Sequence, residues 1–260
     1  MKEMNCTVIK VGGTFAENEE KLDRLAARLA AFPGMIVVVH GGGVLADKLC
    51  DALAIPREKI DGRRVTDDET LRVTVMAYAG WVNKSIVAAL QRAGVNACGL
   101  SGCDERLVVS ARRPAGTIDW GRVGDVERVN AHAIARFVNR GVAPVISPIT
   151  LGAGGELLNT NADSVAGAVA GALVNLYTVD LIFCVDAGGV LADPADPASI
   201  LPALTRRDRE ALDREKAISA GMIPKLDNAF RALDAGARSV RLVHPDDLGN
   251  EERGTKIIAP

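Results

Sequence analysis

The stretch from Met35 to Leu49 reads MIVVVHGGGVLADKL, a β-branched apolar run that passes through three glycines into a segment with helical spacing. The same order occurs earlier, where CTVIKVGG carries Lys10 inside an apolar run and ends at Gly12 and Gly13. Glycines allow close approach of the backbone, and a helix N-terminus adds unpaired N–H groups and the positive end of its dipole. Both strand ends therefore predict anion sites, with a tight turn or a flexible loop as the alternative.

Outward from these two segments, strand-like runs alternate with helix-period segments along the whole chain. This alternation predicts an α/β fold, a three-layer αβα sandwich with a mostly parallel central sheet. The rhythm restarts near Val174, which indicates two lobes, residues 1–174 and 175–260. The expected helices are 17–32, 44–54, 66–91 (with a capping-box signature of Thr66 and Glu69), 130–140 (capped by Asn130), 163–173, 206–218 and 222–235; the expected strands are 6–11, 35–40, 96–100, 144–149, 176–185, 239–244 and 255–259, with a hairpin region at 107–129.

The composition argues against several classes of protein. Of 260 residues, 48% are hydrophobic and 25% are charged, and the net charge is -2 with lysine and arginine dispersed. That is enough apolar material for a large core, and it offers no basic surface for nucleic acid or an anionic membrane. We expect neither a signal peptide nor a transmembrane segment. Five cysteines without a CxxC pair indicate reduced thiols in a cytoplasmic protein, and three histidines argue against a His-rich metal site.

Two isolated lysines and one aspartate carry a strong chemical signal. Lys10 interrupts an apolar strand, and Lys225 lies at the start of a predicted helix, where it opposes the dipole unless an anion binds nearby. Asp163 begins an apolar helix in the segment NTNADSVAGA, and a carboxylate in that position is suited to holding cations in place. Solvated lysines and ordinary helix caps are the alternatives.

Two further loops resemble binding segments. The segment DGRRVT carries Arg63 and Arg64, and an arginine in such a loop either grips a carboxylate in a two-bond fork or remains solvated. The segment DAGGVL, from Asp186 to Leu191, follows a predicted strand. It is either another glycine loop over phosphate or adenosine, or an ordinary turn.

A rival interpretation uses the second glycine segment. Gly41 to Ala46 fits G-x-G-x-x-A, and Asp61 follows in the acidic window of a dinucleotide fingerprint. A NAD-dependent oxidoreductase is therefore an alternative, although it does not explain the glycine pair beside Lys10. His40 on its own is typical of a hydrogen-bonded structural histidine. The P-loop and the HRD/DFG signatures do not occur, so any phosphoryl transfer must use another scaffold.

Taken in order, the motifs KVGG, HGGG, GRRVT, NTNAD, DAGGV and GMIPK resemble those of the amino-acid kinase family, in the pattern of its acetylglutamate kinases. The resemblance runs from Lys10 to Lys225 and covers essentially the whole chain. It implies the carbamate-kinase-like fold, with acylglutamate binding and dimerisation in the lobe 1–174 and ATP binding in the lobe 175–260. It also implies ATP-dependent phosphorylation of the γ-carboxylate of N-acetyl-L-glutamate, in arginine biosynthesis.

The resemblance implies roles for individual residues. Lys10 and Lys225 would stabilise the transferring phosphoryl group, and Asp163 would orient both lysines. Mg²⁺ would be held mainly by the phosphates of ATP. The substrate N-acyl-L-glutamate would be held by Gly42, Gly43, Arg64 (on the α-carboxylate) and Asn159, and the nucleotide by Gly12, Gly13, Asp186, Gly188, Gly189, Leu191, Ala217, Ile218 and Ser219.

Several finer points differ between branches of the family. The stretch 62–102, with VNK and GLSG, is similar to a branch in which some members use N-succinyl-L-glutamate. It is partly similar to relatives that act on carrier-bound glutamate or aminoadipate, which tend to lose the third glycine that Gly43 retains. A non-catalytic amino-acid sensor is a further alternative. The chain starts almost directly at its first strand, so we expect an arginine-insensitive homodimer with the helix 66–91 in the interface.

Overall fold

The computed structural model describes residues 4–13, 18–60, 63–214, 218 and 221–259. Within these residues the main sheet has eight strands in the order β12-β14-β13-β11-β1-β2-β8-β5. All neighbours in it are parallel except β13 and β14. The strands are β1 (Asn5–Val11), β2 (Met35–His40), β5 (Ala97–Ser101), β8 (Ala143–Ser147), β11 (Thr178–Cys184), β12 (Ala203–Leu204), β13 (Ser239–Val243) and β14 (Thr255–Ile257).

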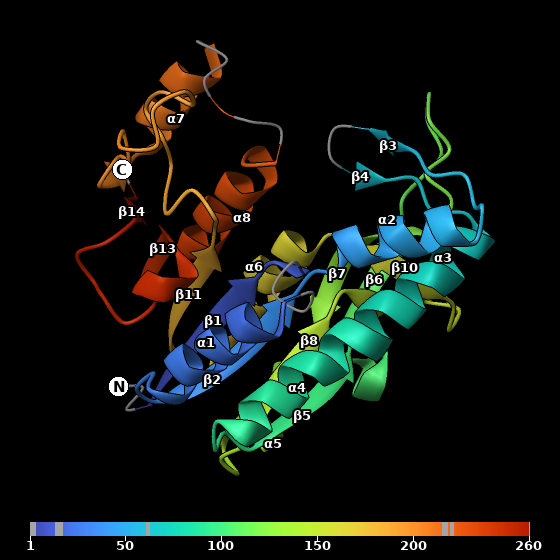
Figure 1. Cartoon of the computed structure of the whole chain (residues 1–260), viewed down its shortest axis with the longest axis horizontal. Helices are drawn as coiled ribbons and strands as arrows, with labels where there is room; N and C mark the ends of the chain where they lie inside the picture. The colour runs from blue at the N-terminus through green and yellow to red at the C-terminus, as the bar shows by residue number, and fades with distance from the viewer. Residues whose placement is uncertain (1–3, 14–17, 61–62, 215–217, 219–220, 260) are drawn as a thin grey trace.

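Helices cover both faces of this sheet, which confirms the expected three-layer sandwich. Helices α1 and α4 pack on one face, and α5, α6 and α8 pack on the other. Figure 1 shows α7 and α8 with β13 and β14 on one side of the molecule, and α2 to α4 with the small antiparallel pair of β3 (Lys59–Ile60) and β4 (Arg63–Arg64) on the other. The helical elements are α1 (Glu19–Ala30), α2 (Gly43–Ala52), α3 (Asp68–Val75), η2 (Met76–Val82), α4 (Asn83–Arg92), η3 (Asp104–Arg106), α5 (Ala131–Val138), α6 (Ala162–Leu173), α7 (Arg206–Arg214), α8 (Ile223–Asp234) and η4 (Pro245–Asp247).

The core explains why the strands are continuous apolar runs rather than alternating ones. Successive side chains of a strand point to opposite faces, and both faces of this sheet are covered. On β1, Val8 is buried in the cluster that contains Val169 of α6, whereas Ile9 is buried in the cluster that contains Leu25 of α1. Lys10 is therefore exceptional in this strand because it is charged and yet buried.

A small closed barrel sits beside the main sheet and completes the fold. It is formed by β6 (Val108–Arg112), β7 (Val123–Val129), β9 (Ile149–Leu151) and β10 (Leu157–Thr160). The antiparallel β6–β7 pair confirms the hairpin expected at 107–129. The strand expected at 144–149 is confirmed as β8, but its expected end is wrong, because β8 ends at Ser147 and β9 begins after Pro148, which has no N–H to continue the pairing.

The long helix expected from Thr66 to Gln91 needs two corrections. The N-cap is Asp67, whose side chain accepts a hydrogen bond from Thr70 N at 2.7 Å. Thr66 instead donates its hydroxyl to Arg64 O at 3.0 Å, so the capping box does not form. In addition, the helix is not uniformly α, because η2 is a seven-residue π-helical segment between α3 and α4. The Asn130 cap is confirmed by a bond from Ala133 N at 3.2 Å.

The same helical run, Asp68–Arg92, is long and apolar enough to cross a membrane by length and composition. It nevertheless packs inside the protein, since α3 lies against α2 and α4 lies against α1, β5 and β8. Its apolar character is therefore explained by the core. Two large apolar side chains on η2 are the exception, because Met76 and Trp81 point to the surface.

All five cysteines are free thiols. Cys6, Cys50 and Cys184 are buried, whereas Cys98 and Cys103 are half-buried. Burial, with a smaller contribution from Asp180, raises the pKa of the Cys6 thiol to about 12. Such a thiol stays protonated at neutral pH and behaves as a small apolar side chain.

Candidate active site

The two isolated lysines converge on one carboxylate. Lys10 Nζ lies 2.9 Å from Asp163 Oδ1, and Lys225 Nζ lies 3.2 Å from Asp163 Oδ2. Burial alone would raise the pKa of Asp163, but Lys10 and Lys225 outweigh it and hold that pKa below its usual range. Burial lowers the pKa of Lys225, and the attraction of Asp163 offsets part of this effect. The three side chains form a buried ionic triad with a surplus of positive charge.

The triad exists because helices α6 and α8 approach each other closely. Asp163 lies in the first turn of α6, whose N-cap Asn161 accepts a bond from Ser164 N at 3.0 Å. Further along α6, a Cβ at Gly167 would lie only 3.0 Å from Asn228 Cβ on α8. The small residue lets the two helix backbones draw together, and this brings Lys225 within reach of Asp163.

The two glycine loops touch each other at the carboxyl ends of β1 and β2. A Cβ at Gly13 would lie 2.5 Å from Gly42 Cα, and a Cβ at Gly42 would lie 2.3 Å from Tyr78 Cδ1. Only glycine fits at both positions. Helix α2 begins after Gly42 without a side-chain cap, so its first N–H groups are available to a bound anion.

A cavity of about 180 Å³ opens beside the triad. It contains all four residues that the family resemblance assigned to the acylglutamate. It adjoins Asp163 through Asn161 and Ala162. The lining residues are Gly41, Gly42, Gly43, Lys59, Arg63, Arg64, Tyr78, Val123, Pro148, Asn159, Thr160, Asn161 and Ala162.

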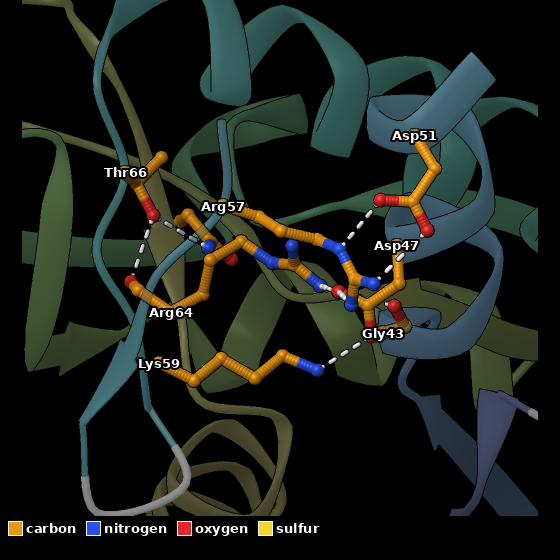
Figure 2. Close-up of polar contacts among 8 residues, drawn as sticks. Gly43, Asp47, Asp51, Arg57, Lys59, Arg64 and Thr66 are labelled. Atoms are coloured by element: carbon orange, nitrogen blue, oxygen red, sulfur yellow. Dashed lines mark hydrogen bonds and ion pairs between the residues drawn. The ribbon is translucent and has the colours of Figure 1, made fainter. Parts of the chain in front are cut away.

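Arg64 has the chemistry of an anion clamp in this cavity. It lies on β4 (Arg63–Arg64), which pairs with β3 (Lys59–Ile60), and its side chain is 4% exposed. Its Nη2 donates to Asp47 Oδ1 at 2.8 Å and to Gly43 O at 3.0 Å (Figure 2). Its Nε and Nη1 are buried and meet no described residue with hydrogen-bond geometry, although Tyr78 lies nearby. Leaving buried donors unpaired is costly, so these two atoms indicate a ligand that accepts from them.

A shared carboxylate holds the cationic side chains around Arg64 in place. Asp47 on α2 accepts from Lys59 at 2.5 Å and forms an ion pair with Arg57 at 3.4 Å, in addition to its bond with Arg64 (Figure 2). Burial opposes ionisation of Asp47, but Lys59 and Arg64 outweigh it and lower its pKa. The carboxylate therefore stays charged and fixes the position of Arg64.

Asn159 on β10 also supports the strand that carries Arg64. Its Nδ2 donates to Thr66 Oγ1 at 3.0 Å, and that hydroxyl donates in turn to Arg64 O at 3.0 Å. The chain of two hydrogen bonds ties β10 to the end of β4. This explains why Thr66 is buried here rather than capping the next helix.

A second cavity, of about 230 Å³, lies over the loop that follows β11. It is largely apolar and is lined by Ala187, Gly189, Val190, Leu191, Pro194, Ile218 and Met222. Three of the nucleotide residues expected from the resemblance, Gly189, Leu191 and Ile218, line it.

The other expected nucleotide residues lie elsewhere. Asp186 lines a smaller cavity of about 60 Å³ with Lys21 and His244. Gly188 turns the chain with φ +78°. Gly12 directly follows β1, beside the contact of Gly13 with the other glycine loop. Ala217 and Ser219 lie outside the described residues.

Several cavity residues were missed in the sequence analysis. Lys59 and Tyr78 line the first cavity, and Asp47 anchors its arginine. For Asp47 a signal was available, because it lies one helical turn after Gly43 and therefore on the same face of α2. For Tyr78 the sequence offered no signal, since an aromatic residue in an apolar helix is typical of the core.

The chain belongs to the amino acid kinase family, whose model matches residues 5–244. It is 45% identical over 257 residues to the acetylglutamate kinase of Phocaeicola vulgatus, with 99% of each chain covered. It is 37% identical over 254 residues to the acetylglutamate kinase of Methanopyrus kandleri, with 96% of this chain and 99% of that one covered.

Solved structures agree on the fold. The protein smu.665 of Streptococcus mutans UA159 is 28% identical, with a TM-score of 0.80 and coverage of 97% of this chain and 98% of that one. The carbamate kinase from Giardia lamblia bound to AMP-PNP is 14% identical, with a TM-score of 0.73 and full coverage of both chains. The carbamate-kinase-like architecture expected from the sequence is therefore confirmed.

Proposed function

We propose that this protein is an acetylglutamate kinase, which uses ATP to phosphorylate the γ-carboxylate of N-acetyl-L-glutamate in arginine biosynthesis. The products are N-acetylglutamyl 5-phosphate and ADP. The observation that carries the proposal is the triad of Lys10, Asp163 and Lys225 beside a cavity in which two buried donors of Arg64 meet no acceptor with hydrogen-bond geometry among the described residues. The names of the curated relatives, at 45% identity over nearly the full chain, support it.

The chemistry requires neutralisation of charge rather than a base. A carboxylate is already ionised at pH 7, so its oxygen can attack the γ-phosphorus while the bond to the β–γ bridging oxygen of ATP breaks. No proton needs to move. The two anions must be brought together against their repulsion, and we assign this task to Lys10 and Lys225, with Asp163 holding both ammonium groups. The glycine N–H groups at Gly13 and Gly42 add donors.

The two cavities suggest how the substrates divide between the lobes. We assign the α-carboxylate of the acylglutamate to Arg64 in the lobe 1–174. The apolar cavity at Gly189, Leu191 and Ile218 suits an adenine ring, and this supports our assignment of ATP to the lobe 175–260. We assign Mg²⁺ to the phosphates of ATP, since the described residues contain no group of three or more His, Cys, Asp or Glu side chains that could hold a metal ion. The free thiols suit a cytoplasmic location.

The reaction can be tested by trapping its product. Incubation of the protein with Mg-ATP, N-acetyl-L-glutamate and hydroxylamine should give an acyl hydroxamate, because hydroxylamine attacks the mixed anhydride. Reactions without ATP serve as the control. If folded protein gives no hydroxamate from either the acetyl or the succinyl substrate, the proposal fails. Quenching of nicotinamide fluorescence in that case would favour an oxidoreductase.

A second candidate for the substrate is N-succinyl-L-glutamate, which differs from N-acetyl-L-glutamate in its acyl group and carries an extra carboxylate. Arg63 lines the cavity with a side chain that is 32% exposed, and its contact with Asp125, at 3.9 Å, is loose. Lys59 lines the same cavity. Two cations at the rim suit an additional negative charge. A competition assay between acetyl- and succinylglutamate decides between the two substrates.

We also propose a homodimer that forms through the helix of α3, η2 and α4. Trp81 is 67% exposed and Met76 is 53% exposed on η2, and large apolar side chains at such exposure are typical of interfaces.

Trp81→Glu is expected to convert the dimer to a monomer, because the charge would have to be buried without a partner. Multi-angle light scattering on native protein and variant would show this change. A native hexamer, or a variant that remains dimeric, would contradict this interface.

A further inference from the structure

A buried histidine lies at the end of β2, directly before the glycine loop of Gly41, Gly42 and Gly43, and the reaction proposed above does not use it. His40 is the last residue of β2 and is fully buried. Its Nδ1 lies 2.8 Å from Gly41 O, and its Nε2 lies 3.0 Å from Asn83 Nδ2. It therefore joins the start of the glycine loop to the first residue of α4.

The neighbours of Asn83 settle which ring nitrogen carries the proton. Asn83 Nδ2 lies 2.9 Å from Val145 O, and Asn83 Oδ1 accepts from Lys84 Nζ at 3.2 Å. The amide nitrogen must therefore face the ring and the carbonyl, because the reverse orientation would set two acceptors together. An amide nitrogen only donates, so His40 Nε2 accepts. The ring proton is then on Nδ1, and it is donated to Gly41 O.

This bond fixes the orientation of one peptide unit. A trans peptide is planar, so the carbonyl of Gly41 and the N–H of Gly42 point in opposite directions. Holding Gly41 O against the buried ring therefore directs the N–H of Gly42 away from it. Glycine has no side chain to restrict the backbone, so without this bond the loop would have a wide choice of conformations.

We propose that His40, held in its Nδ1–H tautomer by Asn83, is a positioning residue that fixes the Gly41–Gly42 peptide for binding of the acylglutamate. The proposal rests on the function proposed above. In this proposal Asn83 selects the tautomer of His40, because the hydrogen bond at one ring nitrogen decides which nitrogen carries the proton.

The surroundings keep the ring neutral. The charged groups that act on it are Lys10 from β1 and Lys84 from α4, both positive. Burial lowers the pKa of His40 to about 4, although the bond to Gly41 opposes this shift and the two lysines add to it. Protonation would put a second donor on Nε2, directly opposite the donor of Asn83. The positioning bond therefore persists at neutral pH, and its support is lost as pH falls through about 4.

Steady-state kinetics on three variants test the proposal. His40→Leu removes the donor, and we expect it to raise the KM for acylglutamate about tenfold, with the KM for ATP changed less than about twofold. His40→Asn keeps a short N–H donor near Gly41 O and should restore most of the affinity. His132→Asn, at an exposed position on α5, is the control and should match the native enzyme. Equal rises in both KM values for His40→Leu, without rescue by His40→Asn, would reduce His40 to a structural role.

A spectroscopic measurement on the native protein covers the case in which His40→Leu does not fold. With only three histidines in the chain, ring ¹⁵N resonances can be assigned individually. His40 should remain neutral with its proton on Nδ1 between pH 5 and 8, and Asn83→Leu should release this preference. A proton on Nε2 in the native protein would overturn the proposal. Lack of turnover with any acylglutamate would instead overturn the proposed function, and the tautomer would still be readable.

Discussion

Replacing Lys10 or Lys225 with alanine is expected to lower kcat on the order of 10²–10³-fold, with the KM for acylglutamate changed less than about threefold. Both ammonium groups lie on Asp163, at 2.9 Å and 3.2 Å, and are therefore preorganised where the negative charge of the transferring phosphoryl group would gather. Such a group stabilises the transition state more than the bound substrate, so its loss appears in kcat.

The control for this experiment is Lys256→Ala, an exposed lysine on β14, which should leave both constants unchanged. Denaturant unfolding should accompany the kinetics, because removal of Lys10 leaves the buried Asp163 short of one partner and is expected to cost about 3–5 kcal/mol of stability. Native kcat in folded preparations of both lysine variants would remove the mechanism.

Arg64→Lys should show the opposite pattern, a rise of roughly 10- to 100-fold in the KM for acylglutamate with a smaller change in kcat. Lysine keeps the positive charge and can still pair with Asp47, as Lys59 does at 2.5 Å. It cannot reproduce the two buried donors, Nε and Nη1, for which the described part of the chain offers no acceptor with hydrogen-bond geometry.

Arg57→Lys is the matched control for Arg64→Lys. Arg57 makes a two-bond contact with Asp51 and also approaches Asp47, but it is exposed and does not line the cavity. Its replacement should change the KM less than about twofold. If Arg64→Lys behaved in the same way, the arginine would be a structural support of the loop rather than a substrate clamp.

The alternation of strands and helices could be predicted from the sequence, because the buried strands are short continuous apolar runs and the helices repeat their apolar residues at helical spacing. Asn130 was identified as a cap correctly, since the signal for a cap is local. Thr66 was not, because its hydroxyl and backbone are taken by Arg64 and Trp120, which are contacts that only the folded chain creates. The break at Pro148 was missed because apolar residues lie on both sides of Ser147 and Pro148.

The site residues likewise divide into those that a local sequence signal identified and those that only the folded chain reveals. Lys10, Asp163 and Lys225 stood out because each violates the pattern of the element that carries it, and they do meet. The tyrosine in the first cavity, Tyr78, fits its helix perfectly well as a core residue, so nothing distinguished it. The π-helical segment around it could not be foreseen either, because its extra residue per turn leaves no simple period in the sequence.

Strand β1 pairs with β2 on one side and with β11 on the other, so the strand that carries Lys10 is shared by both halves of the chain. A gene cut near Val174 would leave one fragment with the bare edge of β1 and the other with the bare edge of β11. Each edge is a template for the other, so reassembly of the fragments would restore this parallel strand pair together with the packing of α6 on α8. For the same reason, sliding of the two halves past each other within the sheet would break this pairing.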